Sequence, residues 1–66
     1  MDIKSEKYRE YVYVDAVYRI DDPRELHVTP NGSHRVIDAD GVTHRPRTDW
    51  LAVRWMPNEG EPPFVA

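Results

Sequence analysis

The stretch YREYVYVDAVYRI, residues 8 to 20, decides the fold class of this protein. Its even positions carry apolar side chains with one exception, whereas its odd positions are mixed and more polar. This period of two residues, rich in Val and Tyr, predicts a strand with one buried face. Because the stretch is long for one strand, we expect a bend or a bulge within it, or a frayed start. The face predicted to be buried comprises Tyr8, Glu10, Val12, Val14, Ala16, Tyr18 and Ile20.

The length and composition of the chain limit its class. The 66 residues, with a net charge of −3, suit one small domain that buries about 60% of the surface of its unfolded chain. The chain has no cysteine, which excludes disulfides and thiolate zinc sites and fits a reducing compartment. The first ten residues are charged and contain no apolar run, so we expect neither a signal peptide nor a membrane span. We therefore predict a cytoplasmic protein.

Shorter patterns divide the rest of the chain. DDPREL, residues 21 to 26, resembles a helix start and predicts at most one short helical turn. SHRVIDADGVTHR, residues 33 to 45, predicts two short strands joined by a tight turn at Asp40-Gly41. WLAVRWM, residues 50 to 56, predicts a last strand, and a short helix over 49–56 is the alternative.

Together these elements predict a small, mainly β domain. Residues 1–56 would form a single antiparallel sheet of about four strands or an SH3-like barrel. Residues 57–66 contain several Pro and Glu and predict an irregular tail. A lone sheet of this size would expose one face and two edges, so it must fold on itself or be covered by a partner.

The Asp-x-Asp-Gly at residues 38 to 41 is the nearest approach to a metal-binding motif. With Gly41 aligned to the glycine of a calcium loop, Val36 and Arg47 occupy positions that need oxygen ligands. The Asp-Gly pair also suits a hairpin turn. The three histidines have no common zinc spacing. We therefore predict a turn and no metal site.

Catalytic patterns are also missing from the sequence. The two serines, Ser5 and Ser33, lie near the N-terminus and in a predicted turn, and His34, next to Ser33, would point to the opposite face of an extended segment. The three glycines form no phosphate-binding loop. We predict a protein that is not an enzyme, with no catalytic residues and no cofactor.

What remains is a surface for binding. Tyr11 and Tyr13 lie on the more polar face of the first strand, between Arg9 and Arg19. Aromatic and basic side chains on a strand face suit single-stranded nucleic acid, a protein partner or plain packing in a curled sheet, and the sequence leaves all three open. The residues that we expect to anchor a partner are Tyr11, Tyr13, Arg45, Arg47 and Trp50.

We favour a small protein-binding module that regulates or inhibits a larger protein or nucleoprotein machine, of the kind encoded by phages and mobile elements. A variant is imitation of a nucleic acid by an acidic surface of Asp15, Asp21, Asp22, Glu25, Asp38 and Asp40. The alternative function is binding of single-stranded nucleic acid through an aromatic and arginine face that includes Arg35, Arg45, Arg47 and Arg54. Another protein is the expected partner, no membrane contact is expected, and the chain would be a monomer or a homodimer formed through an edge strand.

Overall fold

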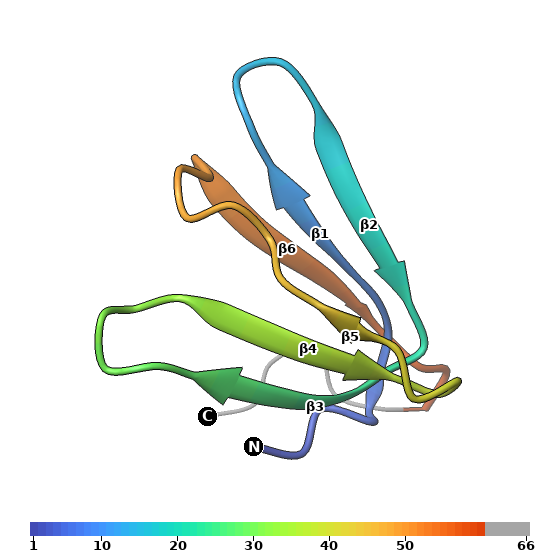
Figure 1. Ribbon diagram of the computed structural model, residues 1–66. Coiled ribbons are helices and arrows are strands. Elements are labelled where there is room, and N and C mark those ends of the chain that lie inside the picture. Colours follow the sequence, from blue (N-terminus) through green and yellow to red (C-terminus); the bar gives the residue numbers. More distant parts are fainter. Residues whose placement is uncertain (61–66) are drawn as a thin grey trace.

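The computed structural model describes residues 1–60 and confirms a small, mainly β domain. Its strands form two three-stranded antiparallel sheets, which lie one above the other in Figure 1 and diverge from one corner. The sheets have the orders β2-β1-β6 and β3-β4-β5. No helix among these residues is long and apolar enough to cross a membrane. The strands are β1 (Glu6–Val12), β2 (Val17–Asp21), β3 (Pro23–Val28), β4 (His34–Asp38), β5 (Thr43–His44) and β6 (Ala52–Pro57).

The stretch from residue 8 to 20 is a hairpin and not one bent strand. β1 pairs with β2 in a register that sets Tyr11 opposite Tyr18. Between the strands, the Tyr13 backbone N–H donates to the Ala16 carbonyl at 2.8 Å and closes a tight turn. The tip residues, Val14 and Asp15, carry no glycine or proline that would signal a turn in the sequence.

The predicted phase is wrong in β1, because its odd positions point inward, whereas Ile20 in β2 is buried as predicted. Arg9, Tyr11 and Tyr13 are 6%, 0% and 8% exposed, whereas Val14 is 88% exposed. The polar appearance of Arg9 is misleading, because Glu6 neutralises its charge inside the protein. Tyr11 and Tyr13 likewise bury their rings and pair their hydroxyls.

The predicted helical turn after Asp22 is also wrong, since residues 23–28 form β3. Asp22 has a φ of 49°, in the left-handed region, and this turns the chain from β2 of one sheet into β3 of the other. Pro23 is tolerated as the first residue of a strand. A bulge at Arg24 then allows both Pro23 and Leu26 to face the core.

The second sheet contains the hairpin that the sequence predicted. β4 pairs with β5, and the connecting turn places Gly41 at a φ of 81°. The Asp38 carboxylate accepts hydrogen bonds from the backbone N–H groups of Asp40 and Val42 at 2.9 and 3.0 Å. The predicted turn is therefore confirmed, with Asp38 as the side chain that stabilises it.

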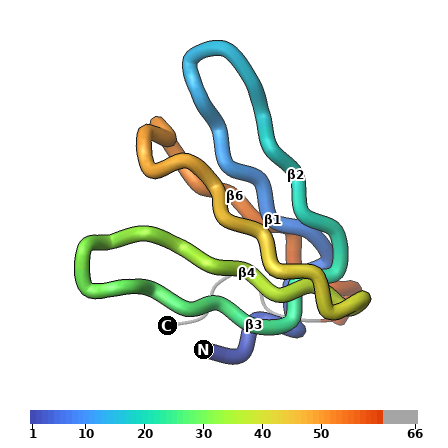
Figure 2. Tube along the Cα trace, viewed as in Figure 1, coloured from blue at the N-terminus to red at the C-terminus, as the bar shows by residue number. Residues whose placement is uncertain are grey.

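The last strand, β6, confirms the strand reading of residues 50 to 56 over the helical one. It pairs with β1, so the chain closes on its own beginning (Figure 2). Just after β6, Asn58 donates from its backbone and side chain to the Ser5 and Lys4 carbonyls. Of the predicted tail, residues 61–66 lie outside the described residues.

The core lies between the two sheets. It consists of Ile3, Tyr11, Tyr13, Ile20, Leu26 and Val36, with Trp50 and Val53 packed against it. Met1 and Ile3 cover part of the outer edge of β3: the Ile3 N–H donates to the Arg24 carbonyl and the Leu26 N–H to the Met1 carbonyl. This covered edge is one that would otherwise be open to pairing with another chain.

Candidate functional site

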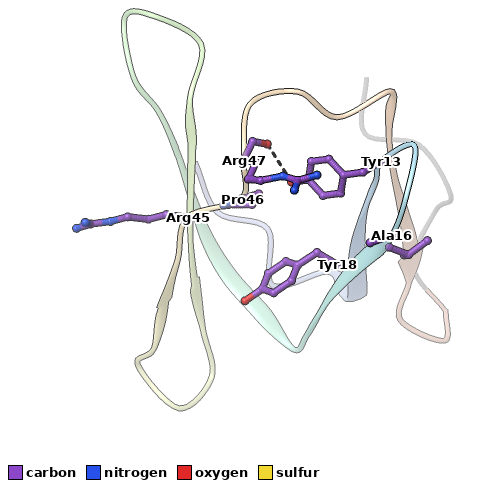
Figure 3. Close-up of a pocket in the computed structure, with 7 residues that line it drawn as sticks. Tyr13, Ala16, Tyr18, Arg45, Pro46 and Arg47 are labelled. Carbon is purple, nitrogen blue, oxygen red and sulfur yellow. Dashed lines mark hydrogen bonds between the residues drawn. The ribbon is translucent and has the colours of Figure 1, made fainter.

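The candidate site is a groove between the β1–β2 hairpin and the segment 45–47, drawn in Figure 3. Its volume is about 360 Å³. The walls are mostly apolar, formed by aromatic rings, a proline and small side chains. The lining residues are Tyr13, Ala16, Val17, Tyr18, Arg45, Pro46 and Arg47.

Tyr13 holds the two sides of the groove together. Its hydroxyl donates to the Arg47 carbonyl at 2.9 Å, the bond dashed in Figure 3. The Arg47 guanidinium lies over the Tyr13 ring, 4.6 Å from its centroid, which is a favourable cation–π distance. Pro46, between the two arginines, is buried and so fixes the segment against the hairpin. The groove is thus built from two elements far apart in the sequence.

Two aspartates anchor Arg47. Its guanidinium lies 3.2 Å from the Asp49 carboxylate and 3.3 Å from that of Asp15. The negative charge of Asp49, followed by the hydrogen bond to Asp15, raises the pKa of Arg47. Burial raises the pKa of the Tyr13 phenol beneath it. At neutral pH the groove therefore presents a neutral aromatic floor and one cation.

Tyr18 forms the exposed aromatic wall, with 43% of its surface accessible. A hydrogen bond of 2.6 Å joins its hydroxyl to Nδ1 of His44, and Nε2 of His44 lies 2.7 Å from Oδ2 of Asp38. The bond to His44 is the main cause that lowers the pKa of Asp38. Through this chain the turn of the β4–β5 hairpin orients an aromatic ring on the other sheet.

The five predicted anchor residues divide between the groove and the core. Tyr13 and Arg47 meet in the groove, and Arg45 borders it, although its side chain extends away from the two tyrosines (Figure 3). The prediction that Tyr11 anchors a partner is wrong, because its side chain is fully buried and has no surface for a partner. Trp50 is partly buried and packs against Tyr11, with ring centroids 5.1 Å apart.

The predicted acidic surface needs one correction. Asp38 is a turn residue whose side chain is 14% exposed, and both its oxygens already accept hydrogen bonds or pair with His44. Asp15, Asp21 and Glu25 pair with Arg47, Arg19 and His27. Asp22 and Asp40 are exposed. The charges of Asp15 and Asp21 are thus offset by neighbouring arginines.

A buried polar network was missed by the sequence reasoning. Arg9 donates to both oxygens of Glu6 at 2.9 and 2.8 Å, and to the Tyr11 hydroxyl at 3.5 Å. That hydroxyl lies 2.7 Å from Nδ1 of His34. Burial opposes the charge of Arg9, but its bonds to Glu6 outweigh this and raise its pKa. Burial, helped by the charge of Arg9, lowers the pKa of His34. The sequence signal for this network was the alternation of Arg9 with Tyr11 and Tyr13, which places an arginine on the same strand face as two tyrosines.

The three histidines lie in separate environments. His27 pairs with Glu25 on the surface, His34 joins the buried network, and His44 bridges Asp38 and Tyr18. Within residues 1–60, no group of three or more His, Asp or Glu side chains is arranged to hold a metal ion.

Neither the family models, nor the curated proteins, nor the solved structures include a match to this chain.

Proposed function

We propose that this protein is a small, non-enzymatic binding module that recognises another protein through the groove of Tyr13, Tyr18 and Pro46. The observation that carries the proposal is this groove itself, in which aromatic rings and a proline from two distant segments surround a mostly apolar hollow. Tyr and Arg are enriched among the residues that contribute most to protein interfaces. Three of the five residues chosen from the sequence, Tyr13, Arg45 and Arg47, border it.

The groove suits an extended segment with a compact apolar side chain. Aromatic-lined grooves of this type take up extended, proline-containing segments, because such segments lose little conformational entropy on binding. Tyr18, with 43% of its surface exposed, is available to pack against that side chain. Arg47, held over the Tyr13 ring by Asp15 and Asp49, would form the polar rim of the groove.

The alternative, binding of single-stranded nucleic acid, has less support. It depended on stacking bases against Tyr11 and Tyr13, but Tyr11 is fully buried and the Tyr13 ring is covered by Arg47, so Tyr13 offers the groove its edge and no open face for a base. Two of the four arginines it required, Arg47 and Arg54, are paired with carboxylates. The net charge of −3 also disfavours contact with phosphates.

The biological role that we propose is that of an accessory regulator or inhibitor in the cytoplasm, acting on a larger protein or nucleoprotein machine of the kind targeted by phages and mobile elements. A small domain without a catalytic pattern would act by occupying a site on its target. Occlusion of this kind requires a rigid surface, which the Tyr13–Arg47 contact supports.

A matched pair of variants tests the proposal. Ala16→Arg places a long side chain in the groove, and Val28→Arg introduces the same residue at an exposed position at the end of β3. We expect the wild type and Val28→Arg, but not Ala16→Arg, to retain one stoichiometric protein from a host lysate treated with nuclease. Equal retention by all three would refute the groove as the site, and loss on nuclease treatment would favour nucleic acid.

A further inference from the structure

The outer face of the second sheet carries a row of basic side chains. His27 on β3 lies opposite Arg35 on β4. Arg45 directly follows β5, in which His44 pairs with Val36, and it lines the same hollow as His27 and Arg35. All three residues are exposed. Arg35 and Arg45, both positive, repel each other across this face, which costs the fold some stability.

The two arginines of this row lack local compensation. Within residues 1–60, Lys4, Arg9, Arg19, Arg47 and Arg54 each have a carboxylate oxygen within 4.0 Å, whereas Lys7, Arg24, Arg35 and Arg45 have none, and of these four only Arg35 and Arg45 lie on this face. The nearby Glu25 pairs with His27 at 3.1 Å. The face therefore holds two guanidinium groups whose charge is available to a ligand.

These arginines border a hollow of about 380 Å³ on that face. The side chain of Arg45 extends away from Tyr13 and Tyr18, as Figure 3 shows, and Arg45 is the residue that lines both hollows. The lining residues are His27, Thr29, Arg35, Ile37, Thr43 and Arg45. Ile37 supplies an apolar centre and Thr43 a hydroxyl between the charged groups.

We propose that this face binds an acidic extended segment of a partner protein, with Arg35 and Arg45 each pairing with a carboxylate. Guanidinium groups bind carboxylates through two parallel hydrogen bonds. An extended segment with acidic residues at alternate positions presents two carboxylates on one side, about 7 Å apart, whereas neighbouring strands are about 4.8 Å apart; the long arginine side chains can span this difference. No aromatic side chain of Tyr, Trp or Phe type lines the described hollow, so nucleic-acid bases would have nothing to stack on. This second contact goes beyond the groove and does not depend on its occupant.

The test is an NMR titration of the ¹⁵N-labelled protein with a capped peptide of alternating Glu and Thr. We expect the backbone amides of Arg35, Ile37, Thr43 and Arg45 and the arginine Nε–H signals to shift. A peptide with Gln in place of Glu should cause no such shift. Shifts spread evenly over all basic residues, or equal effects of both peptides, would overturn the proposal.

Charge reversal at matched sites sharpens the test. Arg45→Glu should weaken binding of the Glu peptide about fivefold, the loss expected for one exposed ion pair. Lys7→Glu is the control, because it changes the net charge by the same amount. Lys7 is also exposed and has no carboxylate within 4.0 Å in the described chain. This variant should keep the Kd for the Glu peptide within about twofold of the wild-type value. Arg45→Gln should lie between wild type and Arg45→Glu. Equal Kd values for Arg45→Glu and Lys7→Glu would contradict the site.

An oligothymidine of matched charge separates the two classes of partner. We expect it to bind more weakly than the Glu peptide and to shift the same amides less. Tighter binding of the oligonucleotide at these residues would reject the acidic protein segment in favour of nucleic acid. Failure of the peptide to bind here would leave the groove variants, Ala16→Arg and Val28→Arg, as a separate test of the proposed function.

Discussion

Arg9 and Glu6 form a two-bond ion pair inside a very small protein, with side chains only 7% and 8% exposed. The two residues share a face of β1 because the register shifts between Glu6 and Tyr8. An ion pair removed from water contributes little net stability, but loss of one partner leaves a buried charge without compensation. The pair therefore acts more as a constraint on the core than as a source of stability.

Glu6→Ala should consequently be severe. We expect it to lower the free energy of unfolding by about 3 to 5 kcal/mol, because Arg9 would remain buried and unpaired. The double variant Glu6→Leu with Arg9→Met should be much less damaging, since it removes both charges. Urea unfolding followed by far-UV circular dichroism measures both. A double variant as unstable as Glu6→Ala would show that packing, and not charge, limits this site.

The inverted phase of β1 makes a second prediction. Tyr11→Ala should cost about 3 to 5 kcal/mol, as for other large aromatic residues removed from a core. Val14→Asp should change stability by less than about 0.5 kcal/mol, because Val14 is 88% exposed at the turn. The alternation of the sequence alone implies the opposite order. Thermal melts of the two variants decide between the phases.

His34 predicts a decline in stability with falling pH. Its folded pKa is lowered by burial and by Arg9, so the unfolded chain binds a proton more readily than the native protein does. The stability from neutral His34 is present above its unfolded pKa of about 6.5 and is lost as pH falls through the folded pKa. His34→Gln should flatten this part of the curve of unfolding free energy against pH, and the surface variant His27→Gln serves as the control. An unchanged slope in His34→Gln would contradict the assignment.

Asp38 affects stability at a lower pH than His34 does, through the turn that it stabilises. Its folded pKa is lowered, chiefly by the bond to His44, so its contribution to stability is lost as pH falls through that value, below about 4. Asp38→Ala should lower the Tm more than Asp40→Ala, because Asp38 accepts two backbone hydrogen bonds and Asp40 is exposed. Excess calcium should leave the Tm unchanged, since both Asp38 oxygens are engaged. A clear rise in Tm with calcium would restore the metal-loop reading.

The fold class followed from the sequence because period-two patterns and the Asp-Gly turn are local signals. The phase of β1 did not, because the burial of Arg9 depends on a partner, Glu6, that reaches it only through a bulge. The helical turn predicted at Asp22-Pro23 was wrong for a related reason, because a carboxylate followed by proline is compatible with both a helix start and the first residue of a strand. In the groove, residue type identified Tyr13 and Arg47, whereas Ala16, Tyr18 and Pro46 take part through contacts between distant segments.

The pairing of β1 with β6 has a consequence for how the protein folds. Val12 pairs with Ala52, so the central strand of one sheet needs residues forty positions away to be complete. The hairpins β1–β2 and β3–β4 close over short loops, but the β1–β6 pairing requires closure of most of the chain, which costs entropy and slows folding. We expect the rate-limiting step to be this closure, which also assembles the groove, since Tyr13 extends from β1 and the segment 45–47 leads into β6. A nascent chain that has not yet released β6 would hold two hairpins but no binding site.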